Sequence, residues 1–482
     1  MSAGQNELRV RATISRAYVR AKIDHASSKY EKCWEMLASI KSRSTRRASS
    51  PKMGLFQSIL GECLFKLEKV FNEIASEKNK LIRRKHEYNR AWFVRRMRGL
   101  GGYQAVIRDT IEMGRCLGDA FAWLMLCKER AILDKHLERK RVVNFPTGIG
   151  GFGELTFIKN VNSLDNHFSL YHSITNILRI GDVSLIKLDD MSLTAIGEIK
   201  TLRKNEDTKT LEMQLYMVGP ALNNFIKATK SKRPAKESAV LPAGMQDRLK
   251  RQMRGMCDAF KAGSPPKASL MVENKTQFGE LSKVILGCKP MKPVYRKMSD
   301  GLLLVAVRDK SRSLSDFFLN ETDFSKSLTG VSDAALDILD ASSQDNSVYL
   351  GNVLYNKDNS AAVCPGMRPV FWWPVDIEAL RMLYFHEVVV VTAFNPVHIM
   401  NKLQSLGYEV EHDNRRKPNL RARKRHKDGW INLMNLDYYL LLVSSLHFSE
   451  EAIVEMIKRT AEEAEKAGLG PNTRVDIRIG QR

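Results

Sequence analysis

Apolar residues recur every three or four positions through the first 140 residues, with charged residues between them. SKYEKCWEMLASIKS (28–42) and LFQSILGECLFKLEKVFNEIASEKNKLI (55–82) show this spacing, which is typical of amphipathic helices. The pattern predicts a helical N-terminal region over residues 1–141. The basic, serine-rich segment 41–54 holds the single proline of this region, Pro51, and is predicted to be a loop between helices.

The pattern changes at VVNFPTGIGGFGE (142–154), where a proline and four glycines end the helical region. GIGGFG (148–153) matches the G-x-G-x-x-G spacing of dinucleotide sites, but the next residue is Glu154, whose charge would repel a pyrophosphate. We therefore expect a turn here. A nucleotide- or effector-sensing module built around these glycines is the least favoured interpretation.

A β-hairpin is predicted next. Two runs of Ile, Leu and Val, 177–188 and 193–201, flank the turn DDMS (189–192), in which Asp favours a turn through its own backbone. The following stretch, 207–230, is expected to be a helix.

The second half of the chain is richer in β-type runs. Strands are expected at 301–308, 347–355, 368–375 and 386–394, and helices at 395–407 and 449–468. The predicted fold class is α+β (mixed α/β). Its parts are the helical region 1–141, a core over 142–229, a linker and helical connection over 230–300, and a mixed α/β domain over 301–482.

The net charge of +23 is the strongest property of the whole composition. Such a charge concentrates polyanions at the protein surface, so nucleic acid or an anionic membrane is the expected partner. The apolar runs are too short for a membrane span, and the seven scattered cysteines form no C-x-x-C pair. We expect a cytoplasmic protein that binds nucleic acid and no membrane.

The hairpin carries acids and a lysine that turn chemistry does not explain. Glu198 and Lys200 are two apart on the second strand, so they share a face, and Asp182 lies on the first strand. Two converging carboxylates repel each other unless a cation neutralises them, and Mg²⁺ or Mn²⁺ suits oxygen ligands. Lys200 beside such a cation could orient a water or stabilise charge on a phosphate.

This arrangement resembles the PD-(D/E)xK nuclease superfamily, with Asp182 as the first acid and Glu198, Ile199 and Lys200 as the E-x-K motif. The resemblance implies a restriction-endonuclease-like core, a small mixed sheet flanked by helices, over residues 142–229. It implies that Glu154 is the glutamate of the preceding helix and that the Ile199 carbonyl joins the metal shell. Gly181 stands where the family often has Pro.

The predicted function is therefore Mg²⁺- or Mn²⁺-dependent hydrolysis of phosphodiester bonds, as an endo- or exonuclease, with DNA favoured over RNA. Restriction, antiviral (phage) defence and repair are the settings in which such nucleases often serve. The competing hypothesis is a non-catalytic nucleic-acid-binding or scaffolding protein with a degenerate nuclease fold, in which Glu198 and Lys200 form a surface pair. The helical N-terminal region is a further candidate surface, for a protein partner or a second copy of the chain.

Two basic segments are candidate nucleic-acid contacts. RRKPNLRARKRHKDGW (415–430) is expected to be an exposed arm that neutralises phosphates, with Trp430 available to stack on a base. RRKHEYNRAWFVRRMR (83–98) interleaves arginines with aromatic residues that favour the core, while its arginines could follow a backbone. His167 and His172 are interpreted as packing residues near the hairpin. The arm's candidate residues are Arg415, Arg416, Lys417, Arg421, Arg423, Lys424 and Arg425.

Overall fold

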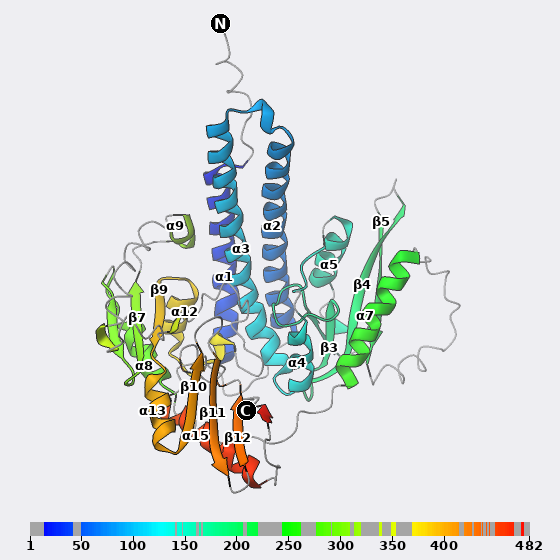
Figure 1. Ribbon diagram of the computed structural model, residues 1–482. Coiled ribbons are helices and arrows are strands. Elements are labelled where there is room, and N and C mark those ends of the chain that lie inside the picture. Colours follow the sequence, from blue (N-terminus) through cyan, green and yellow to red (C-terminus); the bar gives the residue numbers. More distant parts are fainter. Residues whose placement is uncertain are drawn as a thin grey trace. The chain divides into compact units, whose positions relative to one another are not determined.

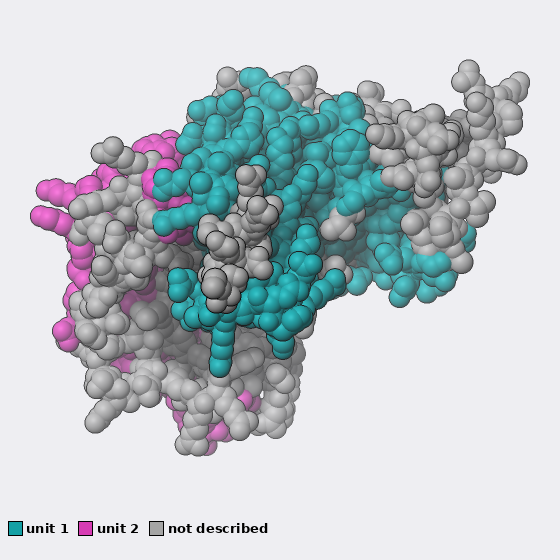
Figure 2. Space-filling view, turned by 90° about the horizontal axis from the view of Figure 1, so that it is seen from above, with its two compact units in different colours: residues 1–265 teal, residues 266–482 magenta. Residues whose placement is uncertain are grey.

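The chain divides into two compact units, Met1–Pro265 and Pro266–Arg482, which Figure 2 colours separately. The computed structural model (Figure 1) confirms an α+β fold with a helical N-terminal region. The described residues are 14–41, 50–139, 142–146, 148–160, 163–164, 167–205, 210–219, 243–261, 276–290, 292–308, 313–319, 337–339, 349–352, 369–413, 419–426, 429–434, 436, 440, 443, 449–466 and 474–476.

Three long helices begin the first unit: α1 (Arg16–Lys41), α2 (Ser50–Arg83) and α3 (Arg90–Leu126). They lie side by side in Figure 1 and bury large apolar side chains between them, among them Phe56 and Phe121, whose rings stack 4.5 Å apart. The short helix α4 (Arg130–Glu138) follows. Because α1 ends at Lys41 and α2 begins at Ser50, the predicted loop 41–54 is wrong at residue 41 and at residues 50–54, and residues 42–49 lie outside the described residues. Pro51 fits the first helical turn, where no backbone N–H is needed.

The glycine-rich segment is a helix, so the expectation of a turn is wrong. Helix α5 spans Ile149–Asn160 and packs against α2 and β4. A Cβ on Gly153 would lie 2.1 Å from Thr201 Oγ1, and one on Gly151 would lie 2.0 Å from the Pro146 carbonyl oxygen. The glycines therefore allow the helix to lie closer to its neighbours than side chains would permit.

A five-stranded sheet lies beside these helices. Its strand order is β1-β2-β3-β4-β5, and every described pair is antiparallel, whereas the family resemblance implied a mixed sheet. The predicted hairpin is present as β3 and β4, although β3 starts at Val183 rather than near residue 177. The bounds are β1 Ser163–Leu164, β2 His167–Tyr171, β3 Val183–Lys187, β4 Ser192–Asn205 and β5 Thr210–Val218.

Strand β5 overturns the helix expected over 207–230 at residues 210–218, whereas residues 207–209 and 220–230 lie outside the described residues. Strand β5 pairs with the edge of β4 from Ile196 to Asn205. This long pairing outweighs the helix propensity of the Leu, Glu, Met and Gln residues in β5. The next described helix, α7 (Ala243–Lys261), packs against β4 and β5. It lies in the range expected to be a linker and helical connection, and the first unit extends through it to Pro265.

The second unit contains two four-stranded sheets, β6-β7-β9-β8 and β10-β11-β12-β13. Strands β7, β8 and β9 lie in three of the predicted runs, whereas the described part of the run at 368–375 contains the 3₁₀ helix η2 and no strand. The bounds are β6 Val294–Lys297, β7 Leu302–Arg308, β8 Tyr349–Asn352, β9 Val388–Phe394, β10 Tyr408–Asp413, β11 Asn419–His426, β12 Gly429–Met434, β13 Arg474–Asp476, α8 Phe278–Leu286, α9 Leu314–Leu319, η2 Val370–Trp372, α12 Ile377–Tyr384, α13 Val397–Ser405 and α15 Glu450–Lys466.

The basic segment 415–430 is not an unstructured arm in its described part. Residues 419–426 form β11 and residues 429–434 form β12, paired with each other in an antiparallel hairpin. Ala422 is buried between exposed arginines, so the strand has one apolar contact face despite its charge. In the described chain, no helix combines the length and apolar character that a membrane crossing requires.

Candidate active site

Asp182 is fixed at the junction of three strands. Its amide donates to the Gly197 carbonyl (2.8 Å), and its carbonyl accepts from the His172 amide (2.9 Å). Its carboxylate Oδ2 accepts from the Ile199 amide at 2.8 Å. Gly181 precedes it with φ +75°, a conformation that favours glycine, and a Cβ there would lie 2.8 Å from the Gly197 oxygen. Glycine at this position therefore allows the turn that brings Asp182 to the second strand.

Glu198 and Lys200 project from the same face of β4, as their spacing predicts. Lys200 Nζ donates to Glu198 Oε1 at 2.6 Å, with side chains 14% and 5% exposed. The side chain of Gln252, from α7, donates to the same Glu198 oxygen at 2.6 Å and accepts from Lys200 Nζ at 3.3 Å. Glu198 is buried and Lys200 is half-buried against α7, so the interpretation as an exposed surface pair does not describe them.

Glu154 comes from α5 and is 2% exposed. Its pKa lies well above the ordinary range because of burial and the charge of Asp182, with a smaller contribution from Glu198. Its Oε1 atom is buried without a hydrogen-bond partner among the described residues. The structure therefore gathers Glu154, Asp182, Glu198 and Lys200 in one place, from three elements.

The carboxylates of this group interact strongly. Burial is the largest of the causes that raise the pKa of Asp182 to about 7, and the charge of Glu198 and a side-chain hydrogen bond with it act in the same direction. The Ile199 amide and Lys200 act in the opposite direction. Two carboxylates that share a buried site resist joint ionisation, and a cation relieves this repulsion.

The donor set fits a hard divalent cation. The unpartnered Glu154 oxygen and the Asp182 carboxyl, whose pKa is raised by burial and by the charge of Glu198, lack enough donors to balance them. Mg²⁺ needs only one or two carboxylates, with water and substrate oxygens completing the shell. Within the described ranges, no group of three or more His, Cys, Asp or Glu is already arranged as a ligand set. Ile199 contributes its amide to Asp182, and the predicted role of its carbonyl stays a prediction.

The loop before Asp182 is held by buried polar groups of the helices. Asp119 on α3 accepts from the amides of Asn176 (2.6 Å) and Ile177 (3.0 Å). His136 on α4 accepts through Nδ1 from the amides of Arg179 (2.8 Å) and Ile180 (3.1 Å). The helical region thus fixes the segment that carries the first acid of the site.

The two histidines near the hairpin are structural in their contacts. His172 is buried between the Gly181 carbonyl (3.0 Å) and the Ser184 hydroxyl (2.8 Å), and burial lowers its pKa to about 4. His167 starts β2, opposite Lys187.

The basic residues predicted as an arm have separate environments. Arg415, Arg416 and Lys417 lie outside the described residues. Arg423 pairs with Glu409 (2.5 Å) and lies 4.7 Å from the centre of the Trp430 ring, so it covers one face of that ring. Lys424 approaches Glu465 at 3.8 Å, whereas Arg421 and Arg425 are exposed.

Gln252 is the site residue that the sequence analysis missed. Another glutamine, Gln214, lies on β5 opposite Lys200. The available signal was the pattern of α7, in which Leu249, Met256 and Ala259 form its buried face. Gln252 follows Leu249 by three positions and precedes Met256 by four, so it is a polar residue on an apolar face.

Comparison of the chain with protein-family models, curated proteins and solved structures gives no match.

The raised pKa of Asp182 predicts a pH-dependent effect of replacing it. Between pH 3.8 and about 7 the folded protein retains a proton that the unfolded chain releases, so stability falls as pH rises through this window. In the metal-free protein, Asp182→Asn should therefore have no stabilising effect near pH 4. Above pH 7 it should raise the free energy of unfolding by up to about 4 kcal/mol. Urea unfolding in EDTA at several pH values measures this difference.

Asp190 provides a control with the opposite sign. Ser192 donates to its carboxylate from both the hydroxyl and the amide, which lowers the pKa of this exposed group. Its favourable contribution is present above its unfolded pKa and is lost as pH falls. Asp190→Asn should therefore destabilise the protein at neutral pH. An Asp182→Asn variant that is destabilised at pH 8 would contradict the buried, repelled carboxylate.

Proposed function

We propose that the protein is a metal-dependent nuclease that hydrolyses phosphodiester bonds of nucleic acid, with DNA favoured over RNA. The observation that carries the proposal is the contact set around β4. Asp182 accepts from the Ile199 amide, burial and the charge of Glu198 raise its pKa, and Lys200 lies against Glu198. An acid, a second acid and a lysine with Glu154 behind them form the donor set that phosphodiester hydrolysis with Mg²⁺ or Mn²⁺ requires.

Each side chain has a distinct role in this proposal. Asp182 and Glu198 would hold the cation, which when bound supplies charge neutralisation and polarises the phosphate. Glu154 supports the site from α5. Lys200 orients the attacking water or stabilises the negative charge that develops on the phosphate oxygens. Gln252 fixes Glu198 and Lys200 relative to each other, because it hydrogen-bonds both.

A non-catalytic nucleic-acid-binding protein is the second candidate. The observation that favours it is the contact of Lys200 with Glu198, which already neutralises one carboxylate without a metal. In that case the buried carboxylates would be a remnant of a nuclease fold and the basic surfaces would carry the function. Metal dependence separates the two candidates.

The test is cleavage by the full-length protein. Supercoiled plasmid, single-stranded DNA and RNA would each be incubated with Mg²⁺, Mn²⁺ or EDTA, and products separated on denaturing gels. We expect cleavage with either cation and none in EDTA. Full protection of all three substrates, together with binding to them, would favour the non-catalytic candidate.

A further inference from the structure

The tip of the α2–α3 hairpin, residues 78–98, carries an unusual density of positive charge. It holds nine Lys and Arg and one acid, Glu87, which gives a net charge of +8. It comprises the end of α2, the 3₁₀ helix η1 (Lys85–Glu87) and the start of α3, at the upper end of the helices in Figure 1.

Most of these cations are not used by the fold. Arg96 is an exception, because it pairs with Glu77 and donates to the Ile14 carbonyl. Arg84 lies 3.8 Å from Glu87. The remaining exposed cations have no hydrogen bond or ion pair to another described residue; they are Lys80, Arg83, Lys85, Arg90, Arg95 and Arg98. Such crowded like charges repel one another, and an external polyanion would relieve that repulsion.

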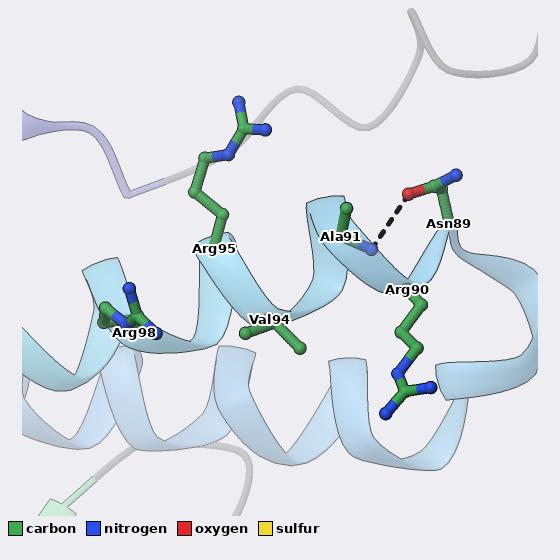
Figure 3. Close-up of a pocket in the computed structure, with 6 residues that line it drawn as sticks. All are labelled: Asn89, Arg90, Ala91, Val94, Arg95 and Arg98. Carbon is green, nitrogen blue, oxygen red and sulfur yellow. Dashed lines mark hydrogen bonds between the residues drawn. The ribbon is translucent and has the colours of Figure 1, made fainter.

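The directions of the arginines indicate the shape of the ligand. Arg90, Arg95 and Arg98 line a shallow surface hollow around Val94. Figure 3 shows Arg90 and Arg95 extending to opposite sides of the helix, so their guanidinium groups do not converge on one point. A single small phosphate would need converging donors. Diverging donors suit a chain of phosphates, such as a nucleic-acid backbone.

The apolar residues of the tip favour nucleic acid over a membrane. Ile82 and Val94 are the large apolar side chains exposed there, at 49% and 46%. Trp92 and Tyr88, expected in the core, are half-buried. Their ring centroids are 4.9 Å apart, so the two rings pack against each other. A helix that lies in a membrane surface needs a broad apolar face, and cations flank Val94 on both sides.

We propose that the tip of the α2–α3 hairpin binds the phosphate backbone of nucleic acid without reading its sequence. Its role as a substrate-holding surface rests on the proposed nuclease function, although the binding itself does not. The charge of Glu68, on α2, is one of the smaller causes that raise the pKa of Glu154. Glu68 precedes Arg83 by fifteen residues on the same helix. At a rise of 1.5 Å per residue this is about 22 Å along the helix. That length corresponds to about six phosphates of one strand.

The test is the salt dependence of binding in EDTA, where cleavage is absent. Binding of a fluorescent 30-base-pair duplex would be measured by anisotropy at several salt concentrations for the full-length protein and for Arg90→Gln/Arg95→Gln/Arg98→Gln. The slope of log K against log salt should fall by about 1 for each arginine, with equal weakening for unrelated sequences. A triple Arg→Lys variant should keep the slope.

The matched control removes the same charge from the second unit, as Lys289→Gln/Lys292→Gln/Lys297→Gln, three exposed lysines. Circular dichroism would verify that both variants are folded. An unchanged slope in the arginine variant, or an equal loss in the lysine control, overturns the proposal. The proposal is also overturned, in favour of a membrane surface, if the arginine variant loses the full-length protein's binding to phosphatidylserine vesicles but keeps its binding to the duplex. Failure of the nuclease would appear separately, as uncut substrate in Mg²⁺ with this binding intact.

Discussion

Lys200→Met should lower the rate of metal-dependent cleavage by about 100-fold or more, with little loss of substrate binding. Lys200 is the one cation in contact with the Glu198 carboxylate among the described residues. In the proposed mechanism its charge would stabilise the negative charge that develops on the phosphate oxygens. Removal of a single preorganised donor to a developing charge costs about 10²–10³ in rate. Single-turnover cleavage of a labelled duplex in Mg²⁺ measures the effect.

The matched control for this variant is Lys187→Met, at the end of β3. Lys187 belongs to the same hairpin but is exposed and makes no described contact with the carboxylates. Its replacement should leave the rate within about two-fold, as surface substitutions usually have small effects. Asp182→Asn should lower the rate at least as much as Lys200→Met does. Full activity in both site variants would show that the cleavage arises elsewhere or from a contaminant.

Gly118→Ala should destabilise the protein by about 3 kcal/mol or more and abolish activity. A Cβ on Gly118 would lie 1.8 Å from the Ile174 carbonyl oxygen, which is backbone and cannot rotate away. Helix α3 or the loop before Asp182 must move, and overpacking of this kind costs about 1–3 kcal/mol, occasionally more. The neighbouring Asp119 would then lose its hydrogen bonds to Asn176 and Ile177. Urea unfolding and cleavage assays report both effects.

Gly101→Ala is the internal control, because it lies on the same helix with no other atom within 4 Å of the added Cβ. Alanine is favoured over glycine in a helix, so this variant should be stabilised by about 0.5–1 kcal/mol. Equal behaviour of the two variants would show that helix propensity, and not the contact with Ile174, decides the outcome. If Gly118→Ala loses activity but keeps its stability, the substitution acts by displacing Asp182 and not by unfolding the protein.

The sequence was sufficient for the parts of the site that depend on local periodicity. Helical spacing predicted the N-terminal helices, and a two-residue spacing placed Glu198 and Lys200 on one face of a strand. The turn at 189–192 followed from Asp chemistry, and Asp190 accepts from Ser192 there. These features are fixed by neighbours in the chain, so a single sequence carries them.

Local patterns were misleading where distant pairing decides the structure. Residues 210–218 contain helix-forming residues but form β5, because β4 offers an unpaired edge along its length. The glycines at 150–153 resemble a turn, but contacts with Pro146 and Thr201 explain them as sites of close helix packing. The basic run 419–426 resembles a solvated loop, but pairing with β10 and β12 makes it a strand.

The convergence of the site was decided by the tertiary structure alone. The sequence supplied Asp182, Glu198, Lys200 and Glu154 as a set, but their meeting depends on Gly181 and on backbone bonds that join Asp182 to β2 and β4. Gln252 enters from a helix more than fifty residues later, and only the packing of α7 on the sheet brings it there. Sequence fixes which groups exist and their local direction; burial and long-range hydrogen bonds decide which of them meet.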